Sequence, residues 1–212
     1  MKKRISMLLA LVFVFSVLFI PVQAADTAGV AVSGTISLDD LDSNPDVIVS
    51  DPMTFTEMIA RMAKNADMSY DGVLRMLPDT MQTQAARSNA YRSFTARLHV
   101  TDEYQPYLDF YCATSEGGHF FNINSIYSIQ LVRSYNGISK QFGGEVNAWL
   151  RSSNSIEYYV NGDFFNNGTT TVSGGTGVNA GLNVKCSVTY SVSYSSNHYK
   201  YFYVHKTIKY GS

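Results

Sequence analysis

The sequence is poor in cysteine, which limits how the chain can be cross-linked. Its 212 residues include only two cysteines, Cys112 and Cys186, which permit at most one disulfide within the chain. Each lies in the apolar phase of an alternating segment. We therefore treat the pair as a candidate disulfide, with two small buried free thiols as the alternative. A chain of this length can bury a core without several disulfides, as one main domain with a small appendage.

The C-terminus lacks an apolar segment, and the N-terminus carries a short one. The run from Ile5 to Ile20 follows basic residues at positions 2–4 and precedes small residues that end at Ala24. This pattern predicts a signal peptide over residues 1–24 and a secreted, extracellular protein. Cleavage would reduce the 16 Lys and Arg by three to 13, against 17 Asp and Glu, for a net charge of about −4. Such a charge argues against a nucleic-acid partner.

Residues typical of active sites are thinly spread. No two histidines have the spacing that would let one element hold a metal with two imidazoles; the four are His99, His119, His198 and His205. Glu157 and Asp163 are the carboxylate pair to consider for glycosidic hydrolysis, but six strand residues separate them by about 20 Å, which is too far. A nucleophile elbow, a phosphate-binding Gly loop and a Cys-His signature are absent. We expect no enzyme activity, no cofactor and no metal.

The segment after the predicted cleavage site is small, polar and acidic. From Ala25 to Met53 it carries several aspartates and no Lys or Arg. This composition predicts a flexible acidic arm over residues 25–53. Val30, Val32, Ile36 and Leu38 alternate with small residues, so a short added strand is the alternative.

A helical pattern begins at Thr54. Apolar residues recur at the spacing of one helix face over residues 55–66, and Thr54 with Glu57 forms a capping box. A second, shorter helix follows and ends before Pro78. The pattern predicts an αα-hairpin over residues 54–78.

Residues 62–75, MAKNADMSYDGVLR, resemble the helix-turn-helix of the lactose-repressor family of DNA-binding proteins. They share an Ala, the Ser cap, a Val and the final Arg with that pattern, whereas Asp67 replaces the turn Gly and Gly72 falls inside the implied recognition helix. The resemblance implies DNA binding. Predicted export and an acidic charge oppose it, so we interpret the hairpin as a structural or docking element.

After a connector over residues 79–93, the chain from Phe94 onward reads as strands. Short alternating apolar segments are separated by turn signals at Asn136-Gly137, Gly143-Gly144, Asn161-Gly162 and Asn166-Asn167-Gly168. All but one of the 15 Tyr residues lie at or after Tyr91. These features predict a mainly β domain over residues 94–212, an antiparallel two-layer sandwich or partly closed barrel, preceded by the αα-hairpin.

The alternation is strongest near the C-terminus. Polar and apolar residues alternate from Leu182 to Ser195, a polar break follows, and β-branched and aromatic residues resume from Tyr199 to Tyr210. We predict that these two segments pair as one long antiparallel hairpin. Residues 169–180 before them form either a loop or a weakly packed strand pair.

Four ring-bearing residues share one face of the last segment: Tyr199, Tyr201, Tyr203 and His205. Phe202, Val204 and Ile208 take the other face. If the second set is core, the first is an outward aromatic stripe, to which Tyr194 adds if the register brings it round. A second layer that covers these tyrosines is the alternative.

The predicted function is a secreted binding or interaction module. Its partner would be a glycan, cell-wall or protein surface that contacts the aromatic face. The alternative is a membrane-acting toxin or bacteriocin-like protein that inserts the Ser/Thr-rich alternation of residues 169–195 as a β-hairpin. The whole arrangement resembles uncharacterised small secreted proteins of Gram-positive bacteria, a likeness that implies no activity.

Overall fold

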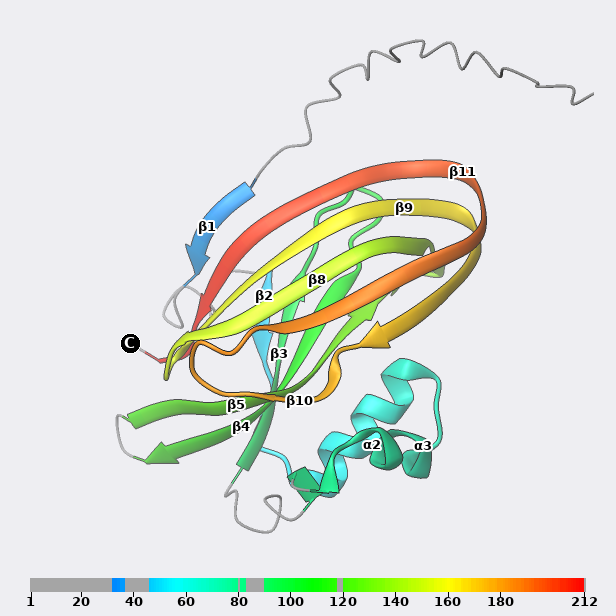
Figure 1. Cartoon of the computed structure of the whole chain (residues 1–212). Coiled ribbons are helices and arrows are strands. Elements are labelled where there is room, and N and C mark those ends of the chain that lie inside the picture. The colour runs from blue at the N-terminus through cyan, green and yellow to red at the C-terminus, as the bar shows by residue number, and fades with distance from the viewer. Residues whose placement is uncertain (1–31, 37–45, 80, 83–89, 118–119, 212) are drawn as a thin grey trace, which may run out of the picture.

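Two packed sheets and a pair of helices make up the fold (Figure 1). The computed structural model describes residues 32–36, 46–79, 81–82, 90–117 and 120–211, and for 32–36, 176–180 and 194–196 it describes the backbone alone. The predicted signal peptide lies outside the described residues. The predicted fold class, a mainly β and largely antiparallel sandwich preceded by an αα-hairpin, is confirmed.

The first sheet, which we term the covered sheet, has the strand order β10-β5-β4-β3-β2. Its strands are β2 (Val47–Val49), β3 (Ala90–Arg97), β4 (Tyr107–Gly117), β5 (Phe120–Val132) and β10 (Thr176–Ala180). β3 begins within the predicted connector. A small hairpin follows β5, with β6 (Ser134–Tyr135) and β7 (Ile138–Ser139) joined by Asn136-Gly137, where both residues have positive φ.

The second sheet, which we term the open sheet, contains the longest strands. Its strands are β1 (Val32–Ile36), β8 (Gln141–Ser152), β9 (Ser155–Gly174) and β11 (Cys186–Lys209), of which β9 and β11 are the longest of the fold. β1 pairs in parallel with β11, and β2 pairs with β3. The structure thus has a strand at residues 32–36, where the sequence left an added strand as the alternative to a flexible arm, and another at residues 47–49.

The predicted hairpin within residues 182–210 is wrong. β11 is one strand of 24 residues, and its antiparallel partner is β9, from Val188↔Gly174 to Lys209↔Ser155. The polar break carries register shifts between Ser193 and Ser196 and between His198 and Lys200, and Asn197 has a φ of 60°. These irregularities bend the strand without reversing it.

The bend brings β11 back onto β8. Its first residues pair with Gly144 to Ala148 of β8, whereas its second half pairs with β9, which flanks β8 on the other side. Figure 1 shows β9 and β11 curving together around the end of β8. The open sheet thus closes partly on itself, as a partly closed barrel does.

Three of the four predicted turn signals lie inside long strands. Gly143-Gly144 is within β8, and Asn161-Gly162 and Asn166-Asn167-Gly168 are within β9. Gly144 and Gly162 face each other, and a Cβ at either would collide with the backbone of the neighbouring strand. Glycine here permits a close approach of two strands and not a chain reversal.

The helices are α2 (Phe55–Ala66) and α3 (Tyr70–Met76), and they lie where the sequence predicts them. The Thr54 side chain accepts from the Glu57 amide and Glu57 accepts from the Thr54 amide, so the capping box is formed. The apolar side of α2 packs on the outer face of the covered sheet, against Tyr91, Tyr111 and Tyr127. Neither helix in the described part of the chain is long and apolar enough to span a membrane.

The main core fills the space between the inner faces of the two sheets. Cys112 of β4 and Cys186 of β11 are both buried there as free thiols. The structure therefore shows two buried thiols and not the candidate disulfide. Burial raises the pKa of both thiols, that of Cys186 to about 12, because desolvation disfavours the thiolate.

Candidate functional site

The residues of the predicted aromatic stripe do not all share one face. Tyr201, Tyr203 and His205 lie on the outer face of the open sheet; Tyr201 is 41% exposed and the other two are half-buried. Tyr199 packs on the core side, because the bulge between His198 and Lys200 shifts the alternation. Its hydroxyl hydrogen-bonds Thr101 at 2.9 Å and its ring contacts Tyr104. The side chain of Tyr194 lies outside what the structure describes.

The register of the open sheet places two further aromatic residues beside His205. Tyr159 of β9 pairs with both His205 of β11 and Asn147 of β8, and Trp149 lies two residues beyond Asn147 on the same face. The ring centroids of Trp149, Tyr159 and His205 lie 6.3 to 6.4 Å from one another. We term these three residues the aromatic cluster.

Trp149 and Tyr159 were missed as site residues, although the sequence contains a signal for each. Trp149 falls between the apolar Ala148 and Leu150, and Tyr159 between Tyr158 and Val160, all four of which are buried. Both candidates therefore occupy the polar phase of an alternation, which is the outer face of a half-buried strand. Their adjacency could not be seen, since it depends on cross-strand register.

Charged groups line one side of the aromatic cluster. His205 Nε2 lies 2.8 Å from Glu157 Oε1, and Arg151 Nη1 lies 3.0 Å from Glu157 Oε2. The Glu157 side chain is largely buried, whereas Arg151 is exposed. Glu157 thus fixes the imidazole on one side and leaves a guanidinium in solvent on the other.

Polar groups also surround the hydroxyl of Tyr159. Lys185 Nζ lies 3.2 Å from it and also above the ring, 5.5 Å from the centroid. The same hydroxyl lies 3.4 Å from Glu145 Oε1. The ring is therefore held in place by contacts at its hydroxyl and on its face.

A buried amide lies beneath this edge of the cluster. Asn147 is fully buried, and its Oδ1 accepts from the Ser187 hydroxyl at 2.5 Å. Its Nδ2 has no hydrogen-bond partner among the described residues. A buried donor without a partner is uncommon in folded proteins and marks the place where a ligand or water acceptor would be stabilised.

The surface is hollowed on both sides of the cluster. A depression of about 330 Å³ is lined by Trp149, Tyr159, Asn183 and Lys185. A second depression, of about 600 Å³, lies along the end of the sheet and is lined by Arg151, Glu157 and Thr207 among others. Both are open to solvent and have polar side chains in their lining, Asn183 and Lys185 in the first and Arg151 and Glu157 in the second, so they suit a ligand with polar groups that lies on the surface.

The histidines and carboxylates considered from the sequence for metal binding or catalysis lie singly or in pairs. Glu157 bonds His205, and Asp163 bonds His198 at 2.8 Å, so each carboxylate of the considered pair has a histidine partner. His99 pairs with Asp46, and His119 lies outside the described residues. Within the part of the chain that the structure describes, no group of three or more His, Cys, Asp and Glu side chains could hold a metal ion.

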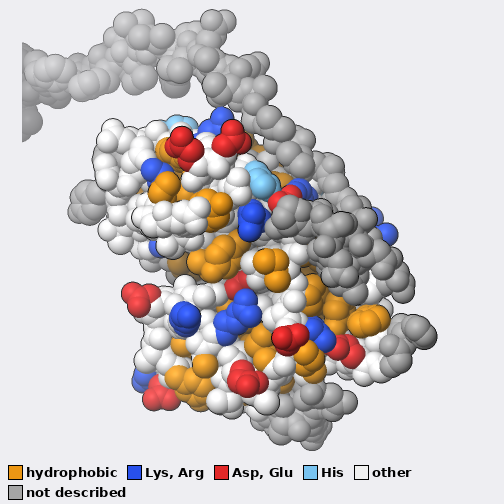
Figure 2. All heavy atoms as spheres, turned by 180° about the vertical axis from the view of Figure 1, so that it is seen from behind, with side chains coloured by type: hydrophobic (Ala, Val, Ile, Leu, Met, Phe, Trp, Pro, Cys, Tyr) orange, Lys and Arg blue, Asp and Glu red, His pale blue; other side chains and the backbone are white. Residues whose placement is uncertain are grey.

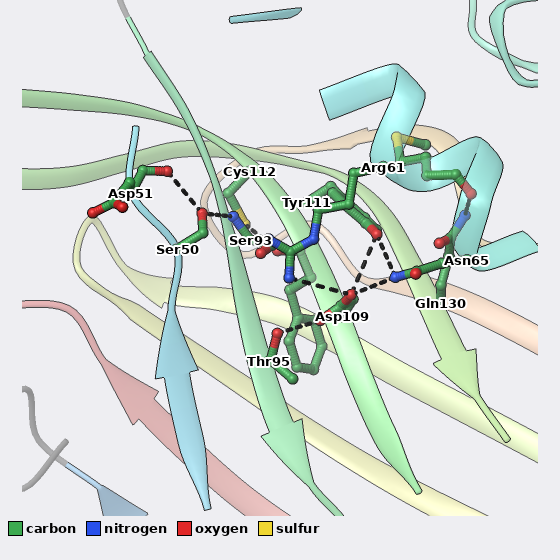
Figure 3. A network of polar contacts seen from close by, with 12 residues as sticks. Ser50, Asp51, Arg61, Asn65, Ser93, Thr95, Asp109, Tyr111, Cys112 and Gln130 are labelled. Atoms are coloured by element: carbon green, nitrogen blue, oxygen red, sulfur yellow. Dashed lines mark hydrogen bonds and ion pairs between the residues drawn. The ribbon is translucent and has the colours of Figure 1, made fainter. Parts of the chain in front are cut away.

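A second polar cluster lies under the helices (Figure 3). Asp109 of β4 is fully buried, and Asn65 of α2 donates to its Oδ2 at 2.6 Å, as does the Tyr111 hydroxyl at 3.3 Å. The Thr95 hydroxyl donates to Oδ1, and Arg61 of α2 lies 4.0 Å away. Figure 3 shows Arg61 and Asn65 pointing from the helix toward Asp109.

The Asp109 cluster joins α2 to the covered sheet. Desolvation raises the pKa of Asp109, and hydrogen bonds from Thr95, Tyr111 and Asn65 together with the Arg61 charge oppose that shift. All these partners belong to the protein itself and both carboxylate oxygens accept hydrogen bonds. We therefore assign this cluster to helix docking, and the aromatic cluster is the better candidate for a functional site.

Charge is spread over the surface without a large field of one sign on the face seen in Figure 2. That face shows acidic and basic side chains interspersed, with hydrophobic side chains exposed between them. Such a surface supports contact through local groups and not long-range attraction of a highly charged partner.

Comparisons of the chain with protein-family models, with curated proteins and with solved structures gave no match. We therefore infer function from the residues of this chain.

Proposed function

We propose that the protein is a secreted module that binds glycans on the outer face of its open sheet, at the aromatic cluster. The observation that carries the proposal is the three-ring arrangement of Trp149, Tyr159 and His205 on a solvent-facing sheet. Flat rings on a rigid sheet suit the apolar faces of sugar rings, and they lose little conformational entropy on binding.

The polar groups around the rings support a sugar ligand over a purely apolar one. Arg151, Lys185 and Glu145 offer charged donors and acceptors next to the rings. The unpaired Nδ2 of Asn147 would donate to a sugar hydroxyl that enters between Tyr159 and Ser187. Rings for stacking and convergent donors and acceptors for hydroxyl groups are the two needs of a glycan site.

Trp149 gives a direct test, because it is the single Trp of the chain. Purified protein without residues 1–24 would be titrated with soluble fragments of bacterial cell-wall polysaccharide while Trp emission is followed. We expect a saturable change in emission. The Tyr159→Ala variant should lose at least about tenfold in affinity, since truncating a central aromatic contact commonly costs 1–2 kcal/mol or more.

Phe120→Ala is the matched control, because Phe120 is an exposed aromatic residue at the start of β5 in the other sheet. It should bind as the unmodified protein does. Equal binding by the Tyr159 and Phe120 variants would refute the site. Failure of every polysaccharide to change Trp149 emission would refute glycan binding.

A second candidate function is membrane insertion by the bent part of β9 and β11. The outer face there is a row of exposed hydroxyl side chains, and the inner face carries Val172, Val188, Tyr190 and Val192; the row is Thr169, Thr171, Ser173, Thr189, Ser191 and Ser193. This alternation has the form of a barrel-forming hairpin. Pairing of β11 with β8 and of β10 with β5 opposes its release. Dye release from liposomes by the same purified protein would favour insertion over glycan binding.

A further inference from the structure

A pocket of about 220 Å³ lies between the helices and the β strands, away from the aromatic cluster. Figure 1 shows the end of β9 close to α2 and α3, and the pocket is lined from both sides of this junction. Its walls are mainly apolar, from Met68, Val73, Met76, Ile129, Leu131 and Val172. The volume is below the ~300–1,000 Å³ typical of sites for drug-sized ligands, so the pocket suits a smaller apolar molecule.

Arg133 lines this pocket and has no acidic partner among the described residues. Its Nη1 donates to Lys140 O at 3.2 Å, to Gln141 Oε1 at 2.6 Å and to Thr170 Oγ1 at 3.0 Å, all uncharged acceptors. Within the described part of the chain it forms no ion pair. Burial lowers the pKa of Arg133, because the guanidinium is desolvated without a counter-charge.

The free side of the guanidinium is the one that binds carboxylates. All three contacts use Nη1, which leaves the Nε and Nη2 hydrogens for another acceptor. Two parallel N–H groups match the two oxygens of a carboxylate, and such bidentate pairs are among the stronger hydrogen-bonded contacts in proteins.

Gln130, which also lines the pocket, has a hydrogen-bond acceptor without a donor among the described residues. Its Nε2 donates to Met62 O at 3.2 Å, which fixes the amide, while its Oε1 is buried and has no partner among the described residues. An acceptor left unpaired in this way costs free energy, and a ligand donor would recover it.

We propose that this pocket binds a small apolar acid with a hydrogen-bond donor beside its carboxylate, as in apolar α-hydroxy acids and α-amino acids. The carboxylate accepts from Arg133, the hydroxyl or ammonium group donates to Gln130 Oε1, and the aliphatic part contacts Val73, Ile129 and Leu131. The polar groups of the ligand thus meet Nε and Nη2 of Arg133 and Oε1 of Gln130, atoms that have no hydrogen-bond partner among the described residues.

The test uses three probes of matched size with the purified protein: 2-hydroxy-4-methylpentanoate, 4-methylpentanoate and 4-methylpentan-1-ol. Titrations are followed by backbone amide chemical shifts. We expect the hydroxy acid to bind most tightly and the alcohol at least about tenfold more weakly, because only the acids can form charge-assisted hydrogen bonds with the guanidinium. The acid without the hydroxyl should fall between them, and leucine should bind like the hydroxy acid.

Two variants locate the binding. Arg133→Gln keeps a donor toward the uncharged acceptors and removes the charge, so it should abolish the preference for acids over the alcohol. Val172→Asp places a carboxylate at the pocket lining and should weaken the acids at least about tenfold. Val184→Asp is its control, since Val172 and Val184 are similarly exposed, at 52% and 50%, and Val184 does not line the pocket.

Retained acid binding by Val172→Asp, or equal weakening by Val184→Asp, would overturn the proposal. Equal affinities for the acid and alcohol probes would also overturn it. So would the absence of chemical-shift changes near the pocket at about 10 mM ligand, since the binding free energy would then be weaker than about −3 kcal/mol. Because the readout is local to residues 129–133 and the helices, the result is independent of glycan binding at Trp149.

Discussion

The outer faces of the two sheets carry similar residues in opposite environments. On the covered sheet, Tyr91, Tyr111 and Tyr127 are at most 1% exposed because α2 and α3 pack on them. On the open sheet, Tyr159 and Tyr201 face outward with no helix over them in the described part of the chain. An aromatic strand face is therefore core or surface according to what is docked on it, and only an exposed face can serve as a binding platform.

The charged groups of the two faces differ in the same way. Under the helices, Asp109 is buried and accepts hydrogen bonds from three side chains. On the open sheet, Glu157 is tied to His205 while its second partner, Arg151, stays 67% exposed. On the covered sheet the buried polar groups bond one another and hold a helix. On the open sheet some polar groups, such as Arg151, remain exposed to solvent.

The largest expected effect separates the two kinds of tyrosine. Tyr111→Ala should lower the free energy of unfolding by about 3 to 5 kcal/mol, by analogy with other large buried aromatics. Tyr201→Ala should change it by about 0.5 kcal/mol or less, as surface substitutions usually do. Urea unfolding followed by circular dichroism measures both.

Tyr199→Ala sharpens this contrast, because the bulge turns Tyr199 toward the core. Its loss should lie between those of the Tyr111 and Tyr201 variants. Equal losses for all three would mean that the two outer faces are covered alike, and the distinction between the sheets would fail.

A smaller effect is expected where the helices are anchored. Thr54→Ala removes the capping box of α2 and should cost about 0.5–2 kcal/mol. Thr56→Ala, at an exposed position within the same helix, is the control and should be neutral or slightly stabilising. Native-state hydrogen exchange of α2 measures both effects. Similar protection in the two variants would show that the cap does not stabilise α2 on the covered sheet.

Two carboxylates of β4 should respond to pH with opposite sign. Arg92 and Tyr210 hydrogen-bond Glu116 and lower its pKa from 4.5 to about 2, so its stabilisation is complete above 4.5 and is lost as the pH falls toward 2. The pKa of Asp109 is raised above 3.8, so its contribution is complete below 3.8 and is lost as the pH rises through the folded value.

Unfolding measured against pH checks these signs. Glu116→Gln should flatten the acid side of the stability profile between 4.5 and about 2. Asp109→Asn should flatten the profile above 3.8. An unchanged profile in the Asp109 variant would contradict the assignment of that carboxyl group to a desolvated site under the helices.

The smallest effect concerns the core that both sheets share. Cys112 and Cys186 should be unreactive toward a thiol reagent in the folded protein at neutral pH, because both are buried and their pKa values are raised. Denaturation without reductant should release two thiols. If no thiols are released, the protein forms the disulfide that the sequence permits, and the free-thiol state is wrong.

The parts of this protein that depend on neighbours in the chain could be predicted from the sequence. The capping box of Thr54 and Glu57, the helix-face spacing of residues 55–66 and the Ser69 cap specify α2 and α3 through local hydrogen bonds and one amphipathic face. Alternation likewise predicted a mainly β fold and placed Tyr201, Tyr203 and His205 on one face, but it left open whether a second layer covers that face. The glycan site remains a proposal, and its central residues, Trp149 and Tyr159, were not among the predicted ones.

Tertiary structure alone decided which strands pair and what covers them. The polar residues near Asn197 are compatible with a turn or with a bend, and pairing with β9 selects the bend. The same bulge moves Tyr199 to the core side, and register brings Tyr159 between His205 and Asn147. The physical reason is that strand pairing and helix docking are set by contacts between residues far apart in the chain, whose free energies depend on register and burial that no local pattern contains.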